Sequence, residues 1–127
     1  MNVNPPQREI KLLIIDDNPI VASFVAEALR VAGFTFESRL IDNAADMTAA
    51  LDSRSWDVVV SDYHMPSFTG LDALRLLRSR DSQTPFILLT FCPFPGLARA
   101  VDQAGGQGCL DKCDLNKLPD LLPSLLV

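Results

Sequence analysis

The sequence is poor in cysteine, has no excess of basic residues and contains no long apolar run. Its three cysteines, Cys92, Cys109 and Cys113, form no CxxC pair, so neither a disulfide framework nor a standard zinc site is indicated. The formal net charge of -5 argues against direct binding to nucleic acid, because phosphate contacts need a basic face. No stretch approaches the length of a membrane span and no signal peptide is evident, so we expect a cytoplasmic protein that does not bind membranes.

The composition is that of one folded domain. The chain has 127 residues, of which 48% are hydrophobic and 21% are charged. This length is enough for one substantial core but too short for two ordinary domains. We expect residues 1–9 to form a polar, proline-bearing extension and residues 10–127 to form the domain.

Predicted strands and helices alternate along that domain. Short apolar runs predict strands at residues 11–16, 35–41, 57–61, 86–89 and 108–111. Helical periodicity and capping residues predict helices at residues 19–33, 43–51, 70–80 and 95–104, with a last helix within residues 115–126. Strands separated by helices predict an α/β fold with a parallel sheet that is covered on both faces.

Three details of these elements can be predicted further. On the first helix, Val21, Phe24 and Val25 belong to an apolar stripe, which is typical of a core-facing surface. Residues 35–41 mix polar and apolar side chains, which suits an edge strand. Pro119 and Pro123 cannot both lie in one regular first turn, so the last helix should be short, kinked or late-starting.

Polar residues follow the apolar runs at the strand ends. The segment "VVVSDYHMPSFTG", residues 58–70, passes from three valines to Asp62 and then to a proline-containing loop. Any one of these polar residues alone is ordinary turn or cap chemistry. In a parallel sheet, however, the carboxyl ends of the strands meet at one edge, where the functional site lies. That edge should collect Asp16, Asp17, Asp62, Thr90 and Lys112.

The segments "IIDDN", "SDYHMPSFTG", "LLT" ending at Thr90, and "GCLDK" resemble the receiver domain of two-component response regulators. The resemblance covers residues 10 to about 126. It implies a flavodoxin-like (βα)5 three-layer sandwich with the strand order 2-1-3-4-5. It also implies a bacterial phosphorelay protein that is phosphorylated on an aspartate and has no independent enzymatic turnover.

The resemblance assigns a magnesium site to the acidic residues. Asp17 and Asp62 would give side-chain oxygens to Mg2+, Asp16 would act through water, and His64 would contribute its backbone carbonyl. Three crowded carboxylates repel one another and should attract a hard divalent cation. A direct imidazole ligand from His64 is disfavoured, because magnesium prefers oxygen.

The resemblance also assigns the phosphoryl chemistry. Asp62 would accept a phosphoryl group from a sensor histidine kinase or a phosphotransfer protein, and Thr90 and Lys112 would contact that group. Catalysis would then consist of positioning and charge stabilisation. Phosphorylation would alter the interaction with a downstream effector protein or output domain.

Three positions depart from the family pattern. Phe91 stands where a small residue usually lets the phosphodonor approach, Cys109 replaces the usual switch aromatic, and Cys113 replaces a frequent proline. These departures leave open a degenerate receiver that acts as a phosphorylation-independent docking module. A haloacid dehalogenase-type phosphatase is disfavoured, because His64 stands where its second acid would be. A dinucleotide-binding domain is disfavoured by the lack of a GxGxxG motif after the first strand.

Two of the cysteines raise a separate possibility. Cys92 and Cys113 each follow a strand end, so they should emerge on the same edge of the sheet. A disulfide or a shared soft-metal site there would give redox control over the loop, provided that the two Cα atoms lie within about 7 Å. The alternative is that the cysteines are small, partly buried residues in a reducing compartment.

Overall fold

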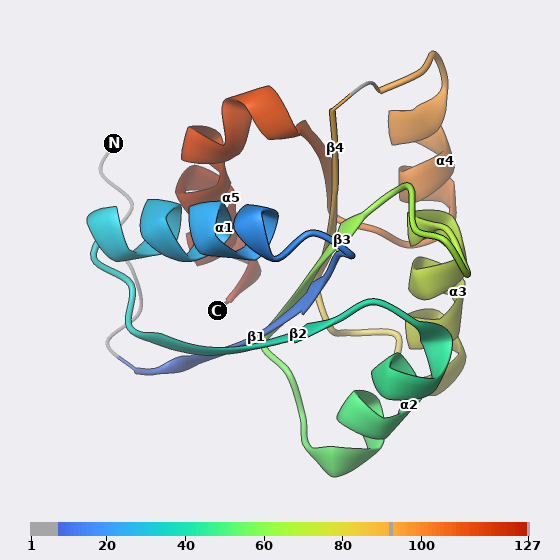
Figure 1. The fold of residues 1–127 in the computed structure, drawn as a ribbon, viewed down its shortest axis with the longest axis horizontal. Coiled ribbons are helices and arrows are strands. Elements are labelled where there is room, and N and C mark those ends of the chain that lie inside the picture. Colours follow the sequence, from blue (N-terminus) through green and yellow to red (C-terminus); the bar gives the residue numbers. More distant parts are fainter. Residues whose placement is uncertain (1–7, 92, 127) are drawn as a thin grey trace.

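The computed structural model describes residues 8–91 and 93–126 and contains a five-stranded parallel sheet (Figure 1). The strand order is β2-β1-β3-β4-β5, as the family resemblance predicts. The strands are β1 (Ile10–Ile15), β2 (Phe36–Ile41), β3 (Val58–Asp62), β4 (Phe86–Thr90) and β5 (Gly108–Asp111). The helices are α1 (Pro19–Val31), α2 (Ala44–Ser53), α3 (Gly70–Arg80), α4 (Leu97–Gln103), the 3-10 helix η1 (Lys112–Lys117) and α5 (Leu118–Leu125). Among the described helices, none is long and apolar enough to cross a bilayer.

Two apolar cores lie on opposite faces of the sheet. Helices α1 and α5 pack on one face, and α2, α3 and α4 pack on the other (Figure 1). Alternate residues of each central strand enter opposite cores: in β3, Val59 faces the α2–α4 layer while Val58 and Val60 face α1 and α5. Both faces of these strands are therefore buried, which explains why their sequences are apolar without alternation.

The loop between β3 and α3 is fixed at both ends. Thr69 caps α3 by accepting a hydrogen bond from the Asp72 N–H, and the Asp72 side chain accepts one from the Thr69 N–H. The first residue of α3, Gly70, lies against the strand, where an added Cβ would be 2.5 Å from the Asp62 carbonyl oxygen and 2.3 Å from a Leu88 methyl. Only glycine allows this approach without a shift, so Gly70 sets how closely α3 starts beside the end of β3.

Several expected element boundaries and contacts are revised by the structure. Helix α4 begins at Leu97 rather than at residue 95, because its N-cap, Gly96, adopts a left-handed conformation with φ of 87°. The sequence predicts a last helix that is short, kinked or late-starting. It has 8 residues and starts at Leu118, after η1, with Pro119 in its first turn and Pro123 inside it. The prediction for Phe24 is wrong: its side chain is 58% exposed, although Val21 and Val25 are buried.

Strand β2 lies at the edge of the sheet, as its mixed composition predicted. The boundary between the extension 1–9 and the domain 10–127 stays a prediction, because residues 1–7 and Val127 lie outside the described part of the chain.

Candidate functional site

The predicted site residues gather at the carboxyl edge of the sheet. Asp16 directly follows β1, Asp62 ends β3, Thr90 ends β4 and Lys112 directly follows β5. The parallel register places these ends together: Ile15 pairs with Ser61, Asp62 with Leu89, and Thr90 with Asp111. Apolar strands with polar ends thus bring residues from distant parts of the sequence to one place.

Three carboxylates form the acidic part of the site. One oxygen from each of Asp16, Asp17 and Asp62 lies within 4.8 Å of the others. Asp16 and Asp62 are buried, whereas Asp17 is exposed. Carboxylate oxygens are the preferred ligands of hard divalent cations, so the donor set fits Mg2+.

Lys112 supplies the positive charge of the site. Its Nζ lies 3.0 Å from Asp16 Oδ2 and 3.1 Å from Asp62 Oδ1. The Lys112 side chain is only 4% exposed, and those of Asp16 and Asp62 are 2% and 11% exposed. This ammonium therefore bridges two buried carboxylates in a region that excludes most of the solvent.

Backbone N–H groups hold the two buried carboxylates in place. The Asn18 N–H donates to Asp16 Oδ1 at 2.8 Å, and the Tyr63 N–H donates to Asp62 Oδ1 at 2.8 Å. Burial raises the pKa of Asp16 above its ordinary value, although the Asn18 N–H and Lys112 oppose this change. Desolvation of the charged form is thus the largest effect on Asp16.

Thr90 and His64 differ in their exposure. Thr90 is 2% exposed at the end of β4. His64 is exposed in the loop after β3, where it forms an isolated antiparallel bridge with Thr69, and its ring meets the Tyr63 ring edge-on at 4.8 Å. The described contacts of the His64 ring are therefore aromatic.

The structure adds a contact that the sequence did not predict. The Phe91 ring, 58% exposed, lies beside Lys112, with 5.1 Å between Nζ and the ring centroid. Farther along the same loop, the Phe94 ring lies 5.3 Å from the Tyr63 ring. The sequence indicated only that a bulky residue follows Thr90. It gave no sign that the ring of Phe91 would meet the ammonium.

The cysteine hypothesis is not decided by the described residues. Cys109 is half-buried, and burial raises the pKa of its thiol. Cys113 is exposed, and its N–H donates to Asp111 Oδ1 at the start of η1. Cys92 lies outside the described residues, so a pairing of Cys92 with Cys113 stays a prediction.

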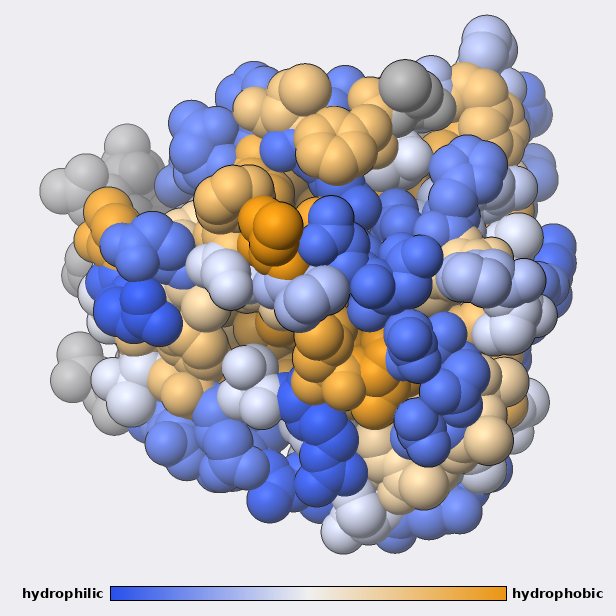
Figure 2. All heavy atoms as spheres, in the orientation of Figure 1, coloured by the Kyte–Doolittle hydropathy of each residue, from blue (hydrophilic) through white to orange (hydrophobic). Residues whose placement is uncertain are grey.

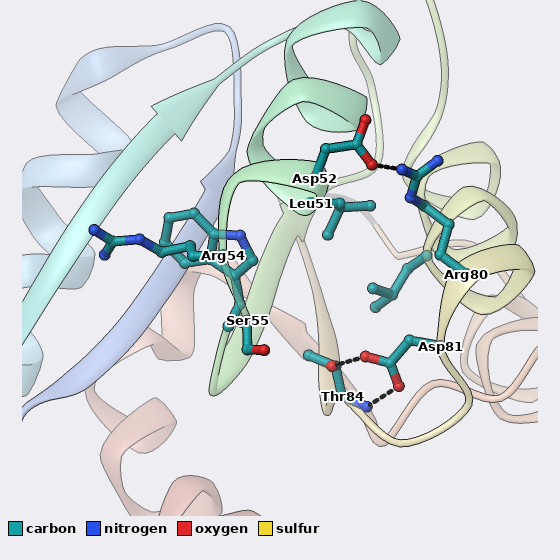
Figure 3. A pocket seen from close by; sticks show the side chains of 9 residues that line it. Leu51, Asp52, Arg54, Ser55, Arg80, Asp81 and Thr84 are labelled. Atoms are coloured by element: carbon teal, nitrogen blue, oxygen red, sulfur yellow. Dashed lines mark hydrogen bonds and ion pairs between the residues drawn. The ribbon is translucent and has the colours of Figure 1, made fainter.

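A larger cavity lies away from this edge. It has a volume of about 450 Å³ and lies between the carboxyl ends of α2 and α3, before β3 and β4 begin (Figure 3). Its charged groups are engaged locally: Arg80 pairs with Asp52, and Asp81 accepts hydrogen bonds from Thr84. Cavity volume would favour this place over the carboxyl edge, where a cavity lined by Asp16 and Asp17 has a volume of about 250 Å³, but the converging buried charges favour the carboxyl edge. Figure 2 shows a mixed surface, with apolar areas separated by hydrophilic side chains.

Comparisons with known proteins agree with this geometry. The family model for the response regulator receiver domain matches residues 12–122. The sensory/regulatory protein RpfC of Xanthomonas campestris is 31% identical over 94% of this chain, and the match spans 17% of the length of RpfC. The Francisella response regulator 1452 receiver domain has a TM-score of 0.80 and 22% identity, over 93% of this chain and 97% of that one.

One further solved structure carries a metal. The receiver domain of the sensor histidine kinase PA1611 from Pseudomonas aeruginosa has a TM-score of 0.72 and 20% identity, over 92% of this chain and 99% of that one. That domain has a magnesium ion coordinated in its active site cleft.

The chain belongs to the response regulator receiver domain family. Such domains are the phosphoacceptor signalling modules of two-component systems and are generally not enzymes. They bind Mg2+ at an acidic pocket and interact with histidine kinases and output domains.

Proposed function

We propose that this domain accepts a phosphoryl group on Asp62 in a Mg2+-dependent reaction. The donor would be a phosphohistidine of a sensor histidine kinase or a phosphotransfer protein. The observation that carries the proposal is the buried ammonium of Lys112, which lies 3.1 Å from Asp62 Oδ1 and 3.0 Å from Asp16 Oδ2. Such an arrangement places positive charge where the phosphoryl oxygens would arrive.

The reaction would be a single in-line transfer. A carboxylate oxygen of Asp62 attacks the phosphorus, the bond from phosphorus to the histidine nitrogen breaks, and its electron pair returns to the imidazole. Lys112 then exchanges its contact with Asp62 for one with the phosphoryl group, and the Thr90 hydroxyl donates to a phosphoryl oxygen. The Tyr63 N–H holds the carboxylate of Asp62 in position throughout.

The residues present fit a magnesium ion. Asp17 and Asp62 would provide side-chain oxygens, His64 its backbone carbonyl, and Asp16 an oxygen that acts through water. When bound, the ion neutralises charge on the phosphoryl oxygens. Asp17, the exposed member of the cluster, would admit the ion from solvent.

The proposed output is a changed interaction with a downstream effector or output domain, in the cytoplasm and without direct contact with nucleic acid or membrane. A degenerate, phosphorylation-independent docking module is the second candidate, because half-buried Cys109 stands in place of the usual switch aromatic. Retention of the acidic cluster together with Lys112 favours the phosphoacceptor. A site without this chemistry has no reason to keep three repelling acids.

Intact-mass spectrometry tests the proposal. With saturating acetyl phosphate, the wild type should gain the mass of one phosphoryl group in the presence of Mg2+ and none after addition of EDTA. Asp62→Asn should remain unmodified, whereas the matched control Asp52→Asn, altered at the distant cavity, should be modified like the wild type. If Asp62→Asn gains a phosphoryl group as the wild type does, Asp62 is not the acceptor.

A further inference from the structure

Phe91 has an unusual position for a large apolar side chain. It is 58% exposed, directly follows Thr90 and lies outside both apolar cores. Its described partner is a charge: the Lys112 Nζ is 5.1 Å from the ring centroid. This distance is within the range of about 6 Å over which an ammonium is attracted to an aromatic face.

The same ammonium contacts both buried carboxylates. Lys112 Nζ bonds Asp16 and Asp62, and its side chain is only 4% exposed. Cation–π attraction strengthens when the cation is desolvated, so this contact belongs to the stronger kind. The ring is exposed and the ammonium beside it is buried, so their contact lies where the buried site meets the surface.

We propose that Phe91 is a positioning residue that holds Lys112 over Asp62 and shields the site from water and small phosphodonors. The proposal rests on the phosphoacceptor function above. Hydrolysis requires a water oxygen to attack the phosphorus while the bond to Asp62 breaks, and phosphate then leaves as the carboxylate is restored. A ring beside the ammonium obstructs this approach, so Phe91 lengthens the lifetime of the phosphorylated state.

The chain provides a matched control on the same loop. Phe94 is also an exposed phenylalanine, at 44%, but its ring packs edge-on against Tyr63 at 5.3 Å. Phe94→Ala therefore removes an exposed aromatic side chain from this loop and leaves the Phe91–Lys112 contact in place.

The experiment measures the lifetime of the phosphorylated protein. Wild type, Phe91→Ala, Phe91→Leu, Phe91→Tyr and Phe94→Ala are phosphorylated with acetyl phosphate and Mg2+, the donor is removed, and loss of the phosphoryl mass is followed with time. We expect Phe91→Ala to hydrolyse at least about fivefold faster and to take up phosphate faster, because the ring no longer obstructs the approach to the phosphorus. A fivefold change in rate corresponds to about 1 kcal/mol, which is within the range of a cation–π contact. Phe91→Tyr should restore the wild-type lifetime, and Phe91→Leu, with bulk but no π face, should be intermediate.

The experiment distinguishes a failure of the proposed role of Phe91 from a failure of the phosphoacceptor function. Equal lifetimes for the wild type and Phe91→Ala, or equal shortening in Phe94→Ala, would overturn the role of Phe91 and leave phosphorylation of Asp62 intact. If neither the wild type nor Phe91→Ala takes up phosphate, the phosphoacceptor function itself is wrong. Urea unfolding of each variant shows that a changed lifetime does not come from a damaged fold.

Discussion

The two ends of the sheet carry similar charges in very different surroundings. At the carboxyl edge, the Lys112 side chain is 4% exposed and the side chain of its partner, Asp16, is 2% exposed. At the opposite end, Arg80 is 36% exposed and its partner Asp52 is 58% exposed. An exposed pair is screened by water and contributes about 0–1 kcal/mol, whereas a buried pair bears a desolvation cost that only its partner offsets. An equivalent ion pair therefore has little effect on stability at one end and a large effect at the other.

Removal of the buried ammonium tests this contrast most strongly. Lys112→Met keeps the apolar stem but leaves two buried carboxylates without their cation. We expect a loss of about 3 kcal/mol in the free energy of unfolding, measured with urea at neutral pH in metal-free buffer. The matched change Arg80→Met at the other end should cost less than about 1 kcal/mol. If both variants lose the same stability, the contrast between the two ends is wrong.

Magnesium binding tests the same contrast between the two ends of the sheet, through the carboxylates of the acidic cluster. A cation that binds only the native state adds about 1.4 kcal/mol at ten times its Kd, so millimolar Mg2+ should raise the melting temperature. Asp17→Asn should lose this rise, because Asp17 belongs to the acidic cluster. Asp52→Asn, at the other end, should retain it. A melting temperature that does not respond to Mg2+ in the wild type would contradict a magnesium site.

The carboxyl edge could be predicted from the sequence because its determinants are local. A short apolar run in the sequence predicts each strand, and the residue that follows the run is therefore the residue at the carboxyl end of that strand. Parallel topology then brings Asp62 and Lys112 to one edge whatever the details of the loops. The meeting of the acidic cluster with the ammonium of Lys112 therefore follows from periodicity and connectivity alone.

Other features depend on conformations that a sequence pattern does not encode. The contact between Phe91 and Lys112 joins two loops through one side-chain orientation. Helix η1 depends on Asp111, whose side chain accepts a hydrogen bond from the Cys113 N–H. The apolar stripe of α1 is wider than its buried face, so periodicity placed Phe24 in the core although it is exposed.

Acid titration gives the smallest expected effect. It distinguishes the two ends of the sheet because the pKa of an aspartate is lowered at one end and raised at the other. At the cavity, hydrogen bonds from the Thr84 hydroxyl and from the Gln83 and Thr84 N–H groups hold the pKa of Asp81 below its ordinary value. A depressed pKa means that this stabilisation is present above the unfolded value, about pH 4, and is lost as pH falls through the folded value. Burial has the opposite effect on the pKa of Asp16, which is raised.

The variant Asp81→Asn measures the stabilisation that comes from the lowered pKa of Asp81. At pH 7 it should be less stable than the wild type by less than about 1 kcal/mol, because the carboxylate is partly screened by solvent. The difference should shrink as pH falls from 5 to about 2, since the wild-type carboxylate is then protonated and loses the same charge. Urea unfolding of both proteins across this range gives the difference directly. A gap that stays constant with pH would show that the Asp81 charge adds nothing to these hydrogen bonds, and that the exposed end of the sheet is even less dependent on charge than the exposed fractions indicate.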